Sequence, residues 1–452
     1  MKIHTCYRAA IRCHYIAVKQ KGNIQFTGTT KVDSYLMKQT ADICLDALKF
    51  FVDVVLKEWD VLSNIKGILR KNRFIETMIH STKNNKAKYT QFDIEFQNMP
   101  SYVRRAIVAD AIGKVSSYKS NLKNWEALPN SERKKKPDLG LSEHYQLTFY
   151  KGEYNTSELD KGIIGLKLYN GKTWDWYYFH MKPSDARYIY KVSQQRKLLS
   201  PIVEQRSNGY FIRFCFEETK ELVPNKPLNH RILAVDLGIN APASWCVMES
   251  DGSVLAKGVV HLPSDEGYLN HVINKKRMYQ QAGKKSKCVY RWIKQANEAL
   301  SIATTKAIME VAILYNVDCI VFEYLERPKK QKGSHKYKER IHMWRANDVQ
   351  SRVELRAHRL GMRISRICAK NTSKYAFDGS GFVERDSKNY SICKFSNGKV
   401  YNCDLSAAQN IGARYFLRAY RKEGIQNIPV VPQCTLNTLK TTVTKSSGLT
   451  AA

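Results

Sequence analysis

Two short apolar segments that each end in an acid constrain the fold of this chain most strongly. One reads "ILAV" before Asp236, and the other reads "CIVF" before Glu323. Uninterrupted apolar runs of this length are typical of strands that are buried on both faces of a sheet. Helical segments alternate with these strands along the chain, so residues 230–370 are predicted to form a mixed α/β domain.

The segment after Asp236 is predicted to return as a three-stranded antiparallel meander. In "PASWCVMESDGSVLAKGVV", Asp251 and Gly252 lie between two apolar stretches, and an Asp-Gly pair favours a tight turn between strands. A basic helical segment is expected over about residues 265–297, followed by a separate amphipathic helix in "ALSIATTKAIMEVAILYN". "MWRANDVQSRVELRAHRLG" has helical spacing again, and Gly361 is expected to end that helix.

The N-terminal half is predicted to be a β-rich domain with a helical insertion. Residues 1–30 alternate between apolar and polar side chains, and residues 142–225 do so again, with Asn-Gly turn signals that favour hairpins. These two segments are expected to form one barrel-like domain. Between them, residues 31–127 have helical spacing, with Ser101 as a candidate N-cap, and residues 128–141 have the composition of a linker.

The charge of the chain predicts a polyanionic partner. Lys and Arg number 74 against 41 Asp and Glu, which gives a formal net charge of +33. Counterion release from phosphates drives the binding of such basic chains, so nucleic acid is the expected partner. The alternative is that the basic runs are solvated surface loops. The residues predicted to contact nucleic acid are Arg133, Lys134, Lys135, Lys136, Lys275, Lys276, Arg277, Lys284, Lys285, Lys329, Lys330 and Lys332.

Cysteine usage and hydropathy predict a cytosolic protein. The eleven cysteines contain no C-x-x-C pair, and many lie in apolar runs, so they are expected to be reduced and mostly buried. No run approaches the roughly 20 apolar residues of a membrane span. The expected location is the cytosol, with no membrane partner.

Three acids at the ends of elements are candidate metal ligands. Asp236 and Glu323 close apolar strands, and Asp404 opens a predicted helix over residues 401–424. A meander followed by helix, strand and helix is the layout of the RNase H-like fold, in which such acids converge. Two magnesium ions would neutralise them and support phosphodiester hydrolysis. Individually, the acids could instead be a turn residue, an ion-pair partner and a helix N-cap.

Three motifs resemble those of the transposon-encoded TnpB nucleases and the compact type V CRISPR effectors. They are "LAVDLGINAPASWCV", "DCIVFEYL" and "YNCDLSAAQNIGARY", which correspond in order to the RuvC motifs of those families. The segments "IVEQRSNGYFIRFCFEE" and "AKNTSKYAFDGSGF" extend the resemblance over roughly residues 200–416. The resemblance implies an RNA-guided DNA endonuclease in which Asp236, Glu323 and Asp404 bind two magnesium ions as the catalytic site.

The resemblance also implies an organisation and a set of partners. The fold class is α/β plus β, with a C-terminal RuvC domain formed by residues 230–370 and 401–424. Residues 1–30 and 142–225 would form a wedge domain that holds guide RNA, with residues 31–127 as a helical recognition lobe. The partners implied are a guide RNA and double-stranded target DNA, bound by a monomer or a homodimer.

One departure from the family pattern concerns zinc. TnpB proteins carry a four-cysteine zinc ribbon after their T-S-K segment, which corresponds to residues 371–400 here. Ala376 and Gly379 stand where the first two cysteines would fall, and Cys393 is followed three residues later by Ser396. One ligand of four cannot hold a structural zinc ion, so no zinc is expected.

Two further segments complete the prediction. The resemblance makes Arg385 a candidate for assisting a phosphate near the acids, with an ordinary surface arginine as the alternative. Residues 425–452 show no core pattern and are expected to form a tail.

Three rival functions remain open at this point. The chain could be an RNA-guided DNA-binding protein that does not cut, or a non-catalytic RNA-binding protein. It could also be a DDE-type transposase. Those enzymes carry their glutamate last, on a late helix, whereas Glu323 is the second of the three acids along this chain.

Overall fold

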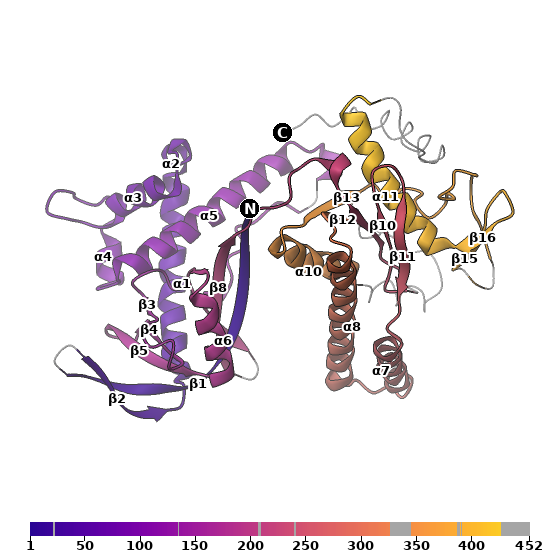
Figure 1. Ribbon diagram of the computed structural model, residues 1–452. Helices are drawn as coiled ribbons and strands as arrows, with labels where there is room; N and C mark the ends of the chain where they lie inside the picture. The colour runs from indigo at the N-terminus through magenta and orange to yellow at the C-terminus, as the bar shows by residue number, and fades with distance from the viewer. Residues whose placement is uncertain are drawn as a thin grey trace. The chain divides into compact units, whose positions relative to one another are not determined.

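The computed structural model of the chain is shown in Figure 1. It describes residues 1–20, 23–133, 135–206, 209–238, 241–325, 345–386, 389 and 391–425. The predicted contact residues Lys134, Lys329, Lys330 and Lys332 and nearly all of the predicted tail therefore lie outside the described residues. The chain divides into two compact units, Lys2–Glu218 and Thr219–Ala452, with Met1 belonging to the second.

The N-terminal unit contains an open, eight-stranded sheet. The described strands pair in the order β3-β4-β5-β1-β8-β6, with β2 on β1 and β7 on β8, so the pairing runs from one edge to another without closing. The sheet combines the first two strands of the chain with six that follow residue 150. The strands are β1 Lys2–Gln20, β2 Asn23–Thr30, β3 Tyr154–Asn155, β4 Ile163–Tyr169, β5 Trp174–Met181, β6 Lys197–Leu198, β7 Ile202–Arg206 and β8 Gly209–Thr219.

The Asn-Gly signals mark hairpins, as predicted. β4 and β5 are antiparallel, and their last pair is Tyr169 with Trp174. Within this turn the Asn170 side chain accepts hydrogen bonds from the backbone of Lys172 and Thr173. Gly171 has φ of 91°, a left-handed conformation that favours glycine. β7 and β8 are also antiparallel, and their last pair is Arg206 with Gly209.

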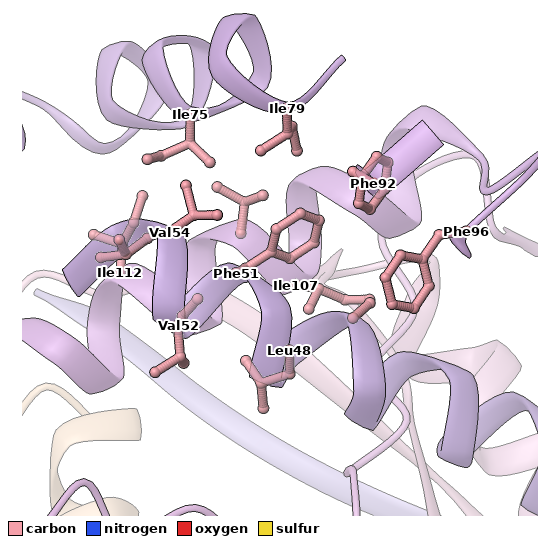
Figure 2. Close-up of a cluster of buried hydrophobic side chains, with 14 of the residues drawn as sticks. Leu48, Phe51, Val52, Val54, Ile75, Ile79, Phe92, Phe96, Ile107 and Ile112 are labelled. Atoms are coloured by element: carbon pink, nitrogen blue, oxygen red, sulfur yellow. The ribbon is translucent and has the colours of Figure 1, made fainter. Parts of the chain in front are cut away.

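In the described part of the chain between β2 and β3 there are five α-helices. They surround a shared core in which α1 and α5 supply most of the side chains, among them Phe51 and Ile107, and Figure 2 shows these two side chains together with Phe92. Ser101 was wrongly predicted as the N-cap of α5: the helix already begins at Ser101, and Pro100 precedes it in an extended conformation. The helices are α1 Ser34–Lys57, α2 Trp59–Asn64, α3 Ile68–Ile79, α4 Gln91–Glu95 and α5 Ser101–Glu126.

The first turns of α1 also join the core of the sheet. Leu36 and Met37 are buried together with sheet residues such as Phe179 and Ile212. α6 (Pro183–Ser193) covers the same core through Ile189. The helices and the sheet of this unit are therefore packed as one body.

The expectation that every cysteine is reduced was wrong for one pair. Cys6 on β1 and Cys215 on β8 form a disulfide. These two strands are neighbours in the sheet, although the cysteines are 209 residues apart in sequence. Sequence spacing could not indicate the pair, because the strand order that brings the two together is a tertiary property.

The C-terminal unit is built on a five-stranded mixed sheet. Its order is β11-β10-β9-β12-β13. β9, β10 and β11 form the predicted antiparallel meander, and β12 runs parallel to both β9 and β13. The strands are β9 Ile232–Asp236, β10 Ala243–Met248, β11 Val254–Val260, β12 Cys319–Glu323 and β13 Arg363–Ile367.

Alternate side chains of the two central strands enter different cores, which explains their uninterrupted apolar sequences. Leu233 and Phe322 pack with α8 (Lys287–Leu314) and α10 (Ala346–Arg359). Ala234 and Val321 pack with α11 (Cys403–Lys422), which lies along the sheet in Figure 1. Both faces are therefore covered, as the sequence predicts.

The helices between β11 and β12 begin and end at other residues than predicted. α7 (Pro263–Gln281) ends just before Gly283, which has φ of 66°. α8 then starts after Ser286, whose hydroxyl accepts a hydrogen bond from Val289 N, and it continues through the whole of "ALSIATTKAIMEVAIL". A glycine turn and a serine cap inside the basic stretch therefore override its continuous helical spacing. The end of α10 near Gly361 (φ 83°) is confirmed.

A small sheet precedes α11. It consists of β14 Glu384–Arg385, β15 Ile392–Lys394 and β16 Val400–Asn402. Its own apolar core contains Ala376, Cys393, Phe395 and Cys403, with Phe377, Val383 and Tyr401 packed around it. Hydrophobic burial thus packs the described part of residues 371–400, and the absence of zinc there stays a prediction.

A buried glutamate makes the stability of the N-terminal unit dependent on pH. Glu153 is 3% exposed, and burial raises its pKa to about 7. A carboxyl with a raised pKa binds its proton more tightly in the folded state, so stability is lost as pH rises from about 4.5 to 7. We expect Glu153→Gln to be more stable than wild type at pH 8 by roughly 3 kcal/mol and equal to it near pH 4.5.

Urea denaturation of the full-length wild type and variant at both pH values measures this difference. A stability difference that does not change with pH would contradict the role of Glu153 ionisation.

Candidate active site

Asp236 and Glu323 lie at the same edge of the C-terminal sheet. β9 and β12 are adjacent and parallel, and Ala234 is the register partner of Val321. Each acid follows two residues later on its own strand and is the last residue of that strand. Both side chains are only partly buried, so this edge is accessible to solvent.

Asp404 lies in the first turn of α11 but does not cap it. The side chain of Asn402 accepts hydrogen bonds from Asp404 N and Leu405 N, each at 2.9 Å, and thereby performs the capping role. The N-cap interpretation of Asp404 was therefore wrong, and its carboxylate is available for another interaction.

The three carboxyl groups share one electrostatic environment. Burial raises the pKa of Asp236 well above its usual value, and the charges of Glu323 and Asp404 raise it further. Burial likewise raises the pKa of Glu323 and of Asp404. A buried carboxylate whose pKa is raised by neighbouring carboxylates is disfavoured in its charged form unless a cation lies close to it.

Arg385 is placed where it reduces this repulsion. Its charge lowers the pKa of both Asp236 and Asp404, against the larger effect of burial. Its Nη2 also donates a hydrogen bond to the carbonyl oxygen of Ser373 at 3.3 Å. Arg385 is exposed, so its guanidinium can still reach a ligand.

The donor set suits magnesium in chemistry but is not arranged as a finished metal site. Among the described residues, no group of three or more His, Cys, Asp or Glu side chains is close enough together to hold a metal ion. The three acids offer only oxygen atoms, which magnesium prefers. Together with Arg385 and the nearby Arg414 they leave one net negative charge, which a divalent cation would offset.

Four polar residues around Glu323 were not identified from the sequence. Thr372 Oγ1 donates a hydrogen bond to Glu323 Oε1, and Gln350 Nε2 donates to the Glu323 carbonyl oxygen at 3.0 Å. The charge of Arg414 lowers the pKa of Glu323, and Asn410 Nδ2 donates to the carbonyl oxygen of Thr372 at 2.9 Å. Three of the four lie in the segments "AKNTSKYAFDGSGF" and "YNCDLSAAQNIGARY". Their polar side chains could not be selected individually, because such residues are common in any loop or helix.

The described basic residues fall into two groups. Arg133 lies over the ring of Trp125 and donates hydrogen bonds to the carbonyl oxygens of Glu126, the last residue of α5, and of Leu128 just after the helix. Lys135 Nζ lies 3.9 Å from Asp138 Oδ2, and Lys136 is exposed. Contact of this group with nucleic acid stays a prediction.

The second basic group gathers at one end of the α7–α8 hairpin. Lys275, Lys276 and Arg277 lie in the second half of α7, and Lys284 and Lys285 lie in the short connection that follows. Lys275 Nζ lies 4.8 Å from the ring centroid of Trp292. Their contact with nucleic acid likewise stays a prediction.

None of the helices in the described part of the chain is long and apolar enough to cross a membrane.

Removing the Asp236 charge is expected to stabilise the metal-free protein. Burial and two like charges raise its pKa, so the folded state loses stability as pH rises above about 3.8 towards the raised value. We expect Asp236→Asn to unfold at a higher temperature than wild type at pH 8 in EDTA, with the gap closing as pH falls towards 4.

Asp251→Asn is the control in the same unit. Hydrogen bonds from Ser253 lower the pKa of Asp251, so neutralising it should bring no gain in melting temperature. Equal melting temperatures for wild type and Asp236→Asn at pH 8 would show that Asp236 carries no such charge penalty.

Comparison with known proteins gives a fold but few sequence matches. A family model described as the Aq_aa04 family matches residues 23–170, which is less than half of the chain. No curated protein matches the sequence. The chain is, however, similar in fold to several solved structures.

Two of these are compact type V CRISPR effectors. One is Cas12f1 in a complex with sgRNA and target DNA, with a TM-score of 0.54 and 13% identity over 91% of this chain and 99% of that one. The other is the mini-RNA-guided endonuclease CRISPR-Cas_phi3, with a TM-score of 0.50 and 11% identity over 92% and 93% of the two chains. The resemblance to compact type V effectors is thereby confirmed at the level of the fold.

Proposed function

We propose that this chain is an RNA-guided DNA endonuclease that hydrolyses phosphodiester bonds with magnesium. The observation that carries the proposal is the placement of Asp236 and Glu323 at matched ends of adjacent parallel strands, with Asp404 on the helix that covers them. A meander, two parallel strands and a covering helix are the parts of an RNase H-like (RuvC) domain. The fold shared with Cas12f1 and CRISPR-Cas_phi3 supports the same reading.

The roles of the site residues follow from their chemistry. Asp236, Glu323 and Asp404 would hold two magnesium ions through their oxygens. Bound magnesium would lower the pKa of a water nucleophile and stabilise the leaving oxygen of the phosphodiester. Arg385, which is exposed beside two of the acids, would bind a non-bridging phosphate oxygen and orient the strand.

Nucleic acid would be bound mainly through phosphates. The net charge of +33 suits a chain that holds both a guide RNA and a double-stranded DNA target. In such proteins base pairing with the guide reads most of the sequence, and the protein contacts backbone and groove shape. We assign the guide to the eight-stranded sheet as a wedge, the heteroduplex to helices α1–α5 as a recognition lobe, and additional phosphate contacts to the basic end of the α7–α8 hairpin. The complex would work as a monomer or a homodimer in the prokaryotic cytosol or nucleoid.

A second candidate function is RNA-guided DNA binding without cleavage. It is favoured by the fact that the described residues include no acid cluster already arranged for a metal. Under this proposal the nucleic-acid surfaces would be used but the three acids would not. The two functions therefore differ in a single measurable property, which is metal-dependent cutting.

The experiment begins with the full-length protein and the RNA that co-purifies with it. Sequencing that RNA supplies the guide, and a supercoiled plasmid that carries the matching target supplies the substrate. We expect cleavage that requires magnesium and that falls on the order of 10³-fold in Asp236→Ala, because metal ions contribute several kcal/mol to such transition states. DNA binding by the Asp236→Ala complex should be unchanged.

Glu310→Ala is the matched control, since Glu310 is an exposed acid on α8 of the same unit that pairs with Lys306. Binding without cutting by wild type would establish the second candidate function instead. Absence of any bound RNA would reject both.

A further inference from the structure

We infer that Thr372 is a positioning residue for Glu323, and that α11 holds Thr372 in place. The same helix would then carry one proposed metal ligand, Asp404, and fix the position of another. This inference rests on the proposed function for what Glu323 does, but the contacts that carry it are independent of that function.

Thr372 contacts the carboxylate directly. Its Oγ1 donates a hydrogen bond to Glu323 Oε1, and the residue is only 2% exposed. The alternative acceptor for the same hydroxyl proton is the carbonyl oxygen of Ala369 at 3.1 Å. A buried hydroxyl with one proton and two nearby acceptors selects the stronger one, and a carboxylate is stronger than a carbonyl.

The backbone around Thr372 is fixed by side chains of α11. Asn410, which is 2% exposed, donates from Nδ2 to the carbonyl oxygens of Thr372 at 2.9 Å and of Tyr375 at 2.8 Å. Arg414 donates from Nη1 to the carbonyl oxygen of Cys368 at 2.7 Å. Three points on residues 368–375 are therefore tied to a single helix.

The conformation of this segment is also restricted locally. Asn371 has φ of 65°, a left-handed conformation that costs free energy for most residues but less for asparagine. A turn held in that conformation directly before Thr372 sets the direction in which its side chain leaves the backbone. The packing of the segment on α11 supplies the interactions that maintain it.

Glu323 is restrained from its other side as well. Gln350 on α10 donates to the Glu323 carbonyl oxygen, and its own Oε1 accepts from Arg366 Nε at 3.2 Å. This pair fixes the end of β12, whereas Thr372 fixes the carboxylate. Replacing the hydroxyl alone should therefore release the carboxylate without releasing the strand.

The hydrogen bond has a function only if Glu323 binds a metal. An oxygen that accepts from Thr372 is oriented, so the remaining lone pairs point in a defined direction. Partners that orient metal ligands in this way typically change metal affinity or activity by 10–100-fold when they are removed. A purely structural threonine would change folding stability instead.

The test compares Thr372→Val, which keeps the shape and removes the hydroxyl, with Thr372→Ser, which keeps the hydroxyl. The probe is Mn²⁺ alone, and its binding to the full-length protein is measured by electron paramagnetic resonance of the free ion. We expect the dissociation constant to rise about 10–100-fold in Thr372→Val and to stay close to wild type in Thr372→Ser. The magnesium concentration that gives half-maximal cleavage should rise by the same factor, with activity recovered at high magnesium.

Thr304→Val is the matched control. Thr304 is also 2% exposed in the same unit, and its hydroxyl donates to the Leu300 carbonyl oxygen within α8. It should lower stability to a similar extent as Thr372→Val without changing Mn²⁺ affinity. Equal Mn²⁺ affinity in Thr372→Val and wild type would overturn the inference, as would an equal loss in Thr372→Ser.

The result also separates this inference from the proposed function. If Asp236→Ala loses Mn²⁺ binding while Thr372→Val retains it, the metal site is correct and only the role of Thr372 is wrong. If the wild type binds no Mn²⁺, both are overturned.

Discussion

The parallel pairing of β9 with β12 is the contact on which the C-terminal unit and its candidate site depend. It brings two uninterrupted apolar strands together in the middle of a sheet, where they are stable only because α8 and α10 cover one face and α11 the other. The same register places Asp236 and Glu323 at one edge. Burial stabilises the sheet, and burial also raises the pKa values of the two acids at its end. The packing that forms the sheet therefore also disfavours the charged forms of these acids.

α11 connects these two consequences. Its apolar face packs on the sheet at close range. At Gly412 a Cβ atom would lie 3.2 Å from Met248 Sδ and 3.3 Å from Ala234 Cβ, so a larger residue there would need these neighbours to shift. The first turn of α11 carries Asp404, and the side chain that caps the helix is that of Asn402, not that of Asp404. Its later turns present Asn410 and Arg414 to the segment that contacts Glu323. The position of α11 on the sheet thus determines where the acids lie relative to one another, because any shift of α11 against the sheet would move Asp404 and Thr372 together.

The sequence predicted those features that depend on local pattern. The apolar runs, the Asp251–Gly252 turn and the Asn170–Gly171 turn indicated buried strands, a meander and a hairpin, and all three are present. The three acids were singled out by their positions at element ends. The Cys6–Cys215 disulfide and the roles of Thr372 and Asn410 could not be found in this way. Each depends on residues that only the folded chain brings together, and their types are common in any loop or helix.

The small sheet before α11 has an apolar core of its own, which lies close in sequence to the candidate site residues. Its apolar core contains Ala376, Cys393 and Cys403, which are all at most 1% exposed. Cys403 directly precedes Asp404, and Ala376 follows closely after Thr372 and Tyr375. The hydrophobic core therefore holds both ends of the segment that reaches the acids. Side-chain packing and hydrogen bonds therefore both contribute to the positions of Glu323 and Asp404.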